Sequence, residues 1–230
     1  MLDLPLGSHT LPMPDRADLT PHGLAGLIAD AIDALALEQV TLVGNDTGGA
    51  LCQMVVTRRP ERIGRLVLTS CDYRDNFPPR MFGYFKPAAA IPGALKLLLA
   101  PMRLRAPRRL PIAFGWLVKR PIDRRAEDSY LLAAMTIPGV AQDLRRVIRG
   151  LDTRYTNEAA DRLREFARPA LIAWSREDRF FKHAHAQQLA QDLPNARLEW
   201  IEHARSLSPE DEPVRLAELI AAFVREPDPA

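Results

Sequence analysis

The sequence predicts an α/β protein whose mostly parallel sheet is flanked by helices and interrupted by an inserted helical cap. Short, nearly continuous apolar runs alternate with helical patterns, as expected for strands covered on both faces. Between residues 76 and 167 no comparable strand pattern occurs, and prolines divide a mostly helical sequence. With 230 residues, 47% of them hydrophobic and 26% charged, the chain fits one globular domain that carries an insertion.

The first predicted elements are a helix, a strand, a tight turn and a second helix. Residues 3–17 are rich in turn-forming residues and show no periodicity. Thr20 is a suitable cap and Pro21 a suitable first residue for a helix that runs to about residue 37. Residues 40–43 are a β-branched apolar run, followed at once by the glycine-rich turn 44–49 and a further helical pattern.

The rest of the core follows the same alternation. We expect strands at 65–70, 169–174 and 197–201, and helices at 184–193 and 212–224. Parallel strands need crossover connections, so this order predicts a sheet with helices on its faces. The expected domain organisation is a first core part at 1–75, the cap at 76–167 and a second core part at 168–230.

Composition excludes several classes of protein. Lys plus Arg is 31 and Asp plus Glu is 29, so the formal charge of +2 gives no argument for a nucleic-acid partner. Cys52 and Cys71 have neither zinc-ligand spacing nor a disulfide framework, which favours a reducing cytoplasm. No apolar run approaches the roughly 20 residues of a membrane span, and the N-terminus lacks a signal-peptide pattern. We expect a cytoplasmic protein without cofactor or metal.

The glycine-rich turn carries the clearest chemical signal. The sequence Gly44-Asn-Asp-Thr-Gly-Gly49 joins a strand to a helix and places Asp46 at the carboxyl edge of the sheet, where open α/β sheets bind ligands. Small residues at Gly44 and Gly48 allow the backbone to pass close to itself. A phosphate-binding loop is disfavoured, because this turn lacks the lysine of a P-loop and the spacing of a dinucleotide fingerprint.

Residues 40–49 resemble the nucleophile elbow of the α/β-hydrolase family, with Asp46 as the nucleophile, as in haloalkane dehalogenases and epoxide hydrolases. The resemblance implies that Thr47 contributes its backbone N–H to an oxyanion hole and that Asn45 lines the pocket beside it. Asp178, after the third strand, occupies the place of the acid that orients a histidine. Asp72, after the second strand, is an alternative acid, but turn chemistry or a cap contact is the preferred explanation for it.

The sequence departs from the family at the residue that should act as the catalytic base. Matching residues 210–213 to the start of the family's last helix places Ser206 where the catalytic histidine is expected, and Arg205 where glycine is frequent. His203 lies three residues earlier, at the end of the last strand. It serves as the base only if the loop is rearranged, and otherwise it is a polar residue at a strand end.

Two further departures concern the pocket. Thr47 stands where dehalogenases carry a tryptophan that lines the pocket. Residues 3–7 resemble the stretch after the family's fourth strand, so we expect an N-terminally truncated chain that lacks the first four strands, including the one whose loop carries the oxyanion motif. A truncated fold leaves the strand at 40–43 as an exposed sheet edge.

The cap is strongly basic. Eleven basic residues and one acid, Asp123, lie between residues 77 and 125. The basic residues are Arg80, Lys86, Lys96, Arg103, Arg105, Arg108, Arg109, Lys119, Arg120, Arg124 and Arg125. A cavity beneath such a cap attracts anions, so an anionic substrate is one hypothesis and a solvated helix surface is its alternative.

The functional hypotheses remain three. The first is a hydrolase acting on a small organic substrate through Asp46, with Asp178 orienting His203 or a water. The second is a non-catalytic binding or interaction protein that has lost the histidine and the oxyanion loop. Membrane contact is not expected, but the basic, apolar stretch 88–125 resembles an interfacial segment and keeps a third hypothesis open. The expected partner is a small-molecule substrate. The sequence leaves open whether the chain forms a homo-oligomer.

Overall fold

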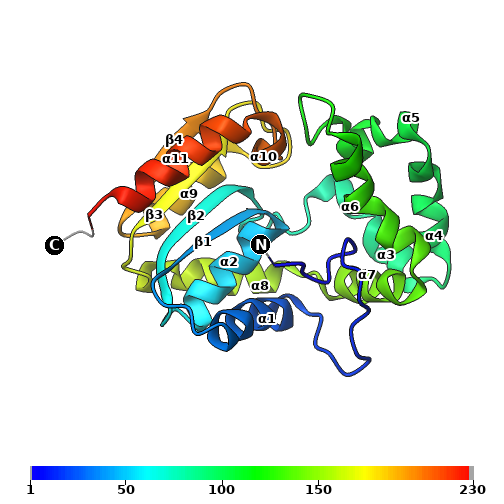
Figure 1. The fold of residues 1–230 in the computed structure, drawn as a ribbon, viewed down its shortest axis with the longest axis horizontal. Helices are drawn as coiled ribbons and strands as arrows, with labels where there is room; N and C mark the ends of the chain where they lie inside the picture. The colour runs from blue at the N-terminus through cyan, green and yellow to red at the C-terminus, as the bar shows by residue number, and fades with distance from the viewer. Residues whose placement is uncertain (1, 228–230) are drawn as a thin grey trace.

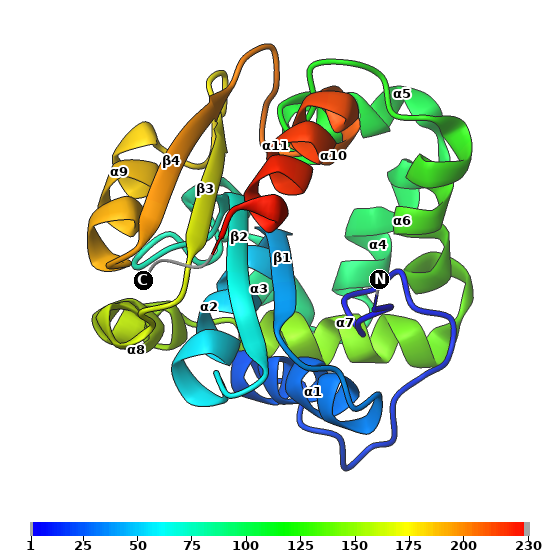
Figure 2. The same ribbon diagram turned by 60° about the vertical axis from the view of Figure 1, so that its left-hand side comes forward.

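The structure, a computed structural model, describes residues 2–227 and contains a four-stranded, fully parallel sheet (Figures 1 and 2). Its strand order is β1-β2-β3-β4, so the predicted fold class is confirmed. The core elements are α1 (Pro21–Ala34), β1 (Val40–Asp46), α2 (Thr47–Arg58), β2 (Ile63–Cys71), α8 (Thr153–Arg162), η4 (Leu163–Glu165), β3 (Ala170–Ser175), α9 (His183–Asp192), β4 (Ala196–Ile201), α10 (Ser208–Asp211) and α11 (Pro213–Arg225).

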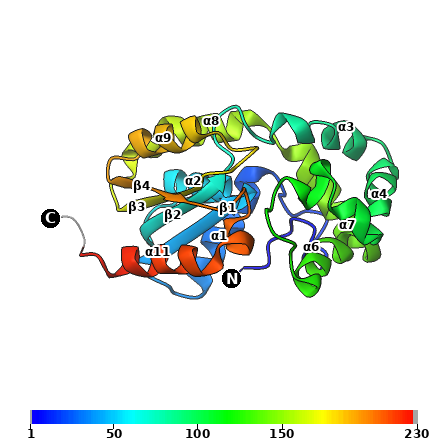
Figure 3. The same cartoon turned by 90° about the horizontal axis from the view of Figure 1, so that it is seen from above.

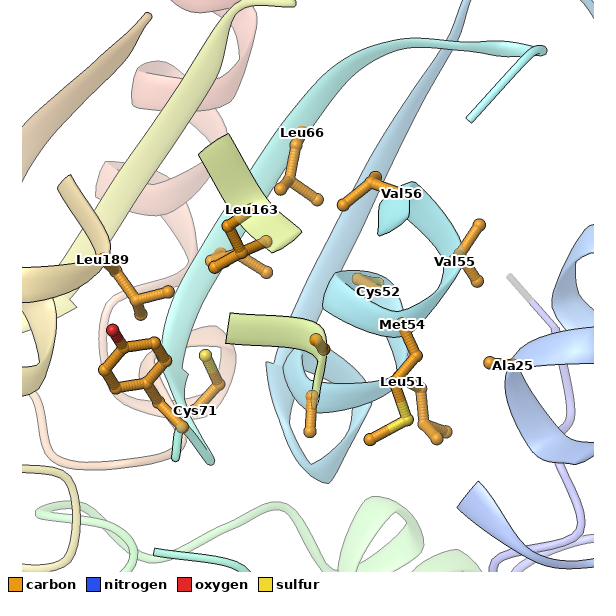
Figure 4. Packing of buried hydrophobic residues seen from close by; sticks show 14 of the residues in the cluster. Ala25, Leu51, Cys52, Met54, Val55, Val56, Leu66, Cys71, Leu163 and Leu189 are labelled. Atoms are coloured by element: carbon orange, nitrogen blue, oxygen red, sulfur yellow. The ribbon is translucent and has the colours of Figure 1, made fainter. Parts of the chain in front are cut away.

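Successive side chains of the central strands point to opposite faces of the sheet, which divides the core into two layers. Leu66 of β2 and Ile172 of β3 belong to the larger cluster, which buries side chains of α1, α2, α8 and α9. The neighbouring Val67 and Leu171 face the other way and pack against α11 (Figure 3). Figure 4 shows the centre of the larger cluster, where side chains of α2 lie between Ala25 of α1 and Leu66.

The cap lies beside the carboxyl edge of the sheet (green in Figure 1). It contains η1 (Arg80–Phe82), α3 (Phe85–Ala90), α4 (Ala94–Leu99), η2 (Ala100–Arg103), α5 (Arg105–Arg108), η3 (Pro111–Gly115), α6 (Arg124–Thr136) and α7 (Pro138–Gly150). Within the expected cap range 76–167, α8 buries Ala159 and Ala160 in the main core cluster. No helix among residues 2–227 is long and apolar enough to cross a membrane.

The N-terminal segment is fastened to the cap through a buried hydrogen bond. His9 Nε2 lies 3.2 Å from Asp143 Oδ2 of α7, and both side chains are buried. The Gly7 N–H donates to His9 Nδ1 at 3.3 Å, and the Met13 N–H donates to Asp143 Oδ2 at 2.7 Å. Because His9 Nδ1 accepts the Gly7 N–H, it carries no proton, and His9 Nε2 is the nitrogen that donates to the Asp143 carboxylate. The segment therefore holds the cap helix against the core.

Candidate active site

The elbow has the geometry of a strained strand-to-helix turn. Asp46 ends β1, precedes α2 and has a φ of 53°, which a residue with a side chain rarely adopts. A Cβ on Gly44 would lie 2.7 Å from the Gly48 oxygen, and a Cβ on Gly49 would lie 2.3 Å from Cys71 Cβ. A Cβ on Gly48 would meet nothing within 4 Å, so the close approach depends on Gly44 and Gly49 rather than on Gly48.

Asp46 is held by the first residue of α2. The Thr47 N–H donates to Asp46 Oδ1 at 2.6 Å, and the Thr47 hydroxyl donates to the same oxygen at 3.3 Å. Both hydrogen bonds reach Oδ1, so within residues 2–227 Oδ2 has no donor. Burial raises the pKa of Asp46 to about 6, against the opposing effect of the Thr47 hydrogen bonds. The carboxyl group therefore titrates near neutral pH.

A second carboxyl group lies behind the first. Asp72 follows β2, is 1% exposed, and its Oδ2 lies 3.3 Å from the Thr47 hydroxyl oxygen, whose single proton serves either Asp46 or Asp72. Its Oδ1 is buried and has no hydrogen-bond partner among the described residues. Burial, and then the charge of Asp46, raise the pKa of Asp72 well above its ordinary value. The Thr47 hydroxyl therefore links two buried carboxyl groups of raised pKa.

The third carboxyl group, Asp178, is paired with Ser206. The Ser206 hydroxyl donates to Asp178 Oδ1 at 2.8 Å, and the Phe180 and Phe181 N–H groups donate to the same oxygen at 2.8 and 2.9 Å. Burial raises the pKa of Asp178 despite these donors, and its Oδ2 is buried without a hydrogen-bond partner among residues 2–227. The charge of Asp178 also raises the pKa of Asp46, so the two groups lie within electrostatic reach.

Asn45 ties the elbow to the loop that carries Ser206. Its Nδ2 donates to the Ser206 carbonyl at 2.8 Å and to the carbonyls of Thr69 and Ser70 at 3.2 and 3.3 Å. The residue lines the cavity, but its amide nitrogen is engaged by three backbone oxygens. Asn45 therefore positions Ser206 beside the end of β1, a role that the local sequence motif did not indicate.

His203 does not reach this cluster. Its side chain is 71% exposed, and the carboxylate beside it belongs to Glu177, 3.9 Å from Nδ1. A φ of 62° at the end of β4 turns the chain there. Among residues 2–227, no hydrogen bond joins His203 to Asp46 or Asp178. In this structure the loop does not bring the His203 imidazole to Asp46 or Asp178, and His203 is an exposed polar residue beyond the end of β4, the alternative that the sequence offered.

Asp211 connects the Ser206 loop with the cap. It is fully buried in α10, and its carboxylate accepts hydrogen bonds from the N–H groups of Lys119 and Arg120 at 2.8 and 2.9 Å. The Arg205 N–H donates to the other oxygen at 2.9 Å. The Arg205 guanidinium donates to the carbonyls of Gly115 and Val118, both at 2.9 Å. Arg205, in the position where glycine was expected, thus fastens the cap loop.

A cavity of about 560 Å³ lies between the elbow and the cap. Asp46 and Thr47 line its floor, and most of the wall is apolar. The apolar lining comes from Leu6, Pro78, Phe82, Phe85, Leu99, Phe114, Leu117, Leu144, Val147, Ile148, Leu151, Leu207 and Pro209. Asp178 is not among the lining residues, so only Asp46 of the two predicted carboxylates faces the cavity.

Tyr130 and Glu210 also line the cavity, and no sequence pattern indicated either of them. The Tyr130 hydroxyl of α6 donates to Glu210 Oε1 of α10, which joins the cap to the core. Of the eleven basic cap residues, only Lys86 lines this cavity. The arginines expected to direct an anionic substrate towards Asp46 lie elsewhere. Among residues 2–227, no three His, Cys, Asp or Glu side chains form a metal-ligand set.

The model of the α/β-hydrolase fold matches residues 12–213 of this chain. The chain belongs to the α/β-hydrolase-fold family. This hydrolase-fold protein is 26% identical over 216 residues to an uncharacterized hydrolase, YugF, of Bacillus subtilis, covering 90% of this chain and 72% of the relative. It is 28% identical over 207 residues to the 2-hydroxymuconate semialdehyde hydrolase of Pseudomonas putida, covering 86% and 66% of the two chains.

Solved structures show the same fold. An α/β-hydrolase-fold protein from Burkholderia ambifaria matches with a TM-score of 0.73 and 22% identity, covering 93% of this chain and 74% of that one. A mutant haloalkane dehalogenase from Agrobacterium tumefaciens matches with a TM-score of 0.73 and 19% identity, covering 93% and 75%. The chain spans 60% to 72% of the length of eight curated relatives that match it in sequence, including the two named above.

Proposed function

We propose that the protein is a hydrolase for a small, mostly apolar organic substrate and that Asp46 is its nucleophile. The observation that carries the proposal is the placement of Asp46 on the strained elbow, at the floor of an apolar cavity, with Oδ1 held by Thr47 and Oδ2 without a donor among residues 2–227. Relatives that carry the name of hydrolases support the reaction class.

The first step follows from the orientation of the carboxylate. An electron pair on Asp46 Oδ2 forms a bond to an electrophilic carbon, and the leaving group departs with the electrons of its own bond. The product is an ester on Asp46. Since the cavity wall is apolar, the substrate is a carbon skeleton with a leaving group rather than a heavily charged molecule.

The second step is hydrolysis of the ester. Water adds to the ester carbonyl, the Thr47 N–H stabilises the oxyanion, and the alcohol departs as Asp46 is regenerated. The proton of the water passes to the departing alkoxide, because neither Asp178 nor Ser206 lines the cavity. No imidazole base lines the cavity among residues 2–227, so the ester on Asp46 is expected to accumulate.

The test is direct detection of the ester. The protein is incubated separately with short bromoalkanes and epoxides, and its intact mass and peptides are then measured. The expected result is a mass increase that maps to Asp46 in the wild type and is absent from Asp46→Asn. Hydrolysis in heavy-oxygen water then labels the Asp46 carboxylate. Labelling at another residue, with Asp46 unmodified, would overturn the nucleophile assignment.

A second candidate function is non-catalytic binding of an apolar ligand. It is favoured by the exposure of His203 and by the Ser206 side chain that hydrogen-bonds Asp178 in place of an imidazole. In that case the same panel gives no covalent product, while apolar ligands bind the wild type and Asp46→Asn with equal affinity.

A further inference from the structure

The outer part of the cap exposes large apolar side chains. Leu104 is 68% exposed, and Leu110 and Ile112 are 47% and 45% exposed, all three within the segment that forms α5 and η3. Leu97, on the preceding helix α4, is 77% exposed. We call residues 97–112 the cap tip. Exposed large apolar residues that recur in one short segment mark an interaction surface more often than isolated ones do.

The same part of the chain is basic. Residues 91–122 contain seven basic residues and no acid: Lys96, Arg103, Arg105, Arg108, Arg109, Lys119 and Arg120. Several of them line a second cavity, the basic cleft, of about 560 Å³. Its charged lining residues are Arg105, Arg108, Arg109, Lys119, Arg120, Asp123, Arg124, Glu127 and Arg205. The sequence-based hypothesis of an anion-attracting cap therefore applies to this cleft rather than to the cavity above Asp46.

Four of the seven cations that line the basic cleft are paired with acids: Lys119 with Glu177, Arg120 with Glu212, and both Arg105 and Arg108 with Asp128. Glu127 is engaged by Arg108 at 3.0 Å and by Arg105 at 3.7 Å. Asp123 caps α6 by accepting the N–H groups of Arg125 and Ala126.

Two exposed cations of the cleft lie outside these ion pairs, although the charge of one of them, Arg124, lowers the pKa of Asp128. Within residues 2–227, Arg109 and Arg124 form no ion pair, and both are exposed. Arg109 lies directly before Leu110 and so borders the apolar residues of the cap tip.

We propose that the cap tip docks on an anionic lipid bilayer, with Leu104, Leu110 and Ile112 in the interface and the basic cleft on lipid phosphates. Apolar side chains beside exposed cations fit a surface whose apolar layer lies just beneath negative headgroups. Free phosphate supplies no apolar layer, so it leaves the exposed leucines unexplained. The expectation against membrane contact rested on the lack of a spanning segment, which surface docking does not require.

The docking surface adjoins the cavity above Asp46. Leu99 lines that cavity, while Leu97, on the same helix, is exposed at the cap tip. Phe114 lines both the cavity and the basic cleft. The cap tip and the wall of the cavity thus share the helix α4, and Phe114 lies between the cavity and the basic cleft. The docking surface itself stands independently of the chemistry proposed for Asp46.

The experiment is co-sedimentation of the full chain with two sets of vesicles, phosphatidylcholine alone and phosphatidylcholine mixed with phosphatidylglycerol. We expect binding to the anionic vesicles, weakening as salt is added, and at most weak binding to the neutral ones. Binding that persists in Asp46→Asn separates the docking surface from the proposed reaction. Absence of binding to anionic vesicles at low salt would overturn the proposal.

Variants locate the surface. Arg109→Glu changes the local charge by two units, so binding falls about 25-fold at low salt, about fivefold for each charge. Its matched control is Arg16→Glu, an exposed arginine of the N-terminal segment, which keeps wild-type binding. Leu104→Ser reduces binding about tenfold through lost apolar burial, whereas Leu35→Ser, an exposed leucine next to α1, does not. Equal losses in test and control variants would overturn the assignment.

Two further measurements distinguish other occupants. Inorganic phosphate that binds Arg109 tightly enough to abolish vesicle binding at matched ionic strength would show a soluble-anion site and overturn the proposal. Self-association of the chain that Leu104→Ser abolishes, seen by sedimentation without vesicles, would show a contact between copies and overturn it also. Circular dichroism of each variant confirms that the fold is retained.

Discussion

The Ser206 hydroxyl donates a hydrogen bond of 2.8 Å to Asp178 Oδ1, at the position where the resemblance to hydrolases implies a histidine. The pair retains the acid and its orientation but replaces an imidazole by a hydroxyl group. The Asn45 amide holds the Ser206 carbonyl at 2.8 Å, which keeps this loop next to the elbow. If Asp46 is the nucleophile proposed above, an ester on Asp46 is therefore expected to form more readily than it is hydrolysed.

Ser206→His is expected to speed hydrolysis of the Asp46 ester about a hundredfold or more, the usual contribution of a general base. The imidazole takes the place of the hydroxyl beside Asp178. The larger side chain in a fully buried position costs about 1–3 kcal/mol of stability. The measurement is the lifetime of the ester by mass spectrometry after excess substrate is removed. Ser206→Ala is the control, and an unchanged lifetime in Ser206→His would exclude a base at this position.

The rate of ester formation should rise with pH through about 6 and then level off. Asp46 attacks only when ionised, and burial raises its pKa to about 6. Thr47→Val removes the hydroxyl that donates to Asp46 while keeping the backbone N–H, so the midpoint moves to higher pH. The measurement is the initial rate of mass increase from about pH 5 to about pH 8. A flat profile in the wild type would argue against attack by this carboxylate.

Asp46→Asn should stabilise the protein at neutral pH. The folded-state pKa of about 6 lies above the unfolded value of 3.8, so the wild type is most stable below about pH 4 and loses stability as the pH rises through 6. Asn does not titrate, and the variant gains about 3 kcal/mol above pH 7 by this effect. The measurement is urea unfolding at several pH values. In the control Asp123→Asn, which removes an acid of lowered pKa at a helix start, the pH trend has the opposite sign.

His9→Ala should destabilise the cap. It leaves the Asp143 carboxylate buried in α7 without its imidazole partner, which costs about 2–4 kcal/mol in the free energy of unfolding. The matched control is His22→Ala, whose partly exposed ring lies 3.6 Å from Glu158 and which should cost about 1 kcal/mol or less. Equal losses would mean that the His9 contact does not hold the segment to the cap.

Most of the sheet was predictable from the sequence. The expected strands at 65–70 and 169–174 correspond to Ile63–Cys71 and Ala170–Ser175, because continuous apolar runs identify strands that are covered on both faces. The strand expected at 40–43 extends to Asp46, since Gly44 and Asn45 also pair with β2. Glycine lacks strand propensity, so the pattern stopped short of the elbow.

The site was predictable only where local sequence determines it. The glycines around Asp46 enforce the turn wherever the rest of the chain lies, so its place at the sheet edge followed from the motif. The Asn45 contact with Ser206 spans 161 residues, and the Ser206 contact with Asp178 spans 28, so both depend on tertiary packing. The direction of His203 depends on a positive φ that its sequence neighbours do not specify.

Asp211 connects the cap with the loop that carries Ser206. One carboxylate accepts backbone N–H groups from Lys119 and Arg120 on the cap side and from Arg205 on the loop that ends in Ser206. Separating the cap segment at Lys119 and Arg120 from the loop of Ser206 therefore breaks hydrogen bonds to a single buried carboxylate. A ligand that moved this segment would be coupled to the Ser206–Asp178 pair, and such a coupling acts equally in both directions.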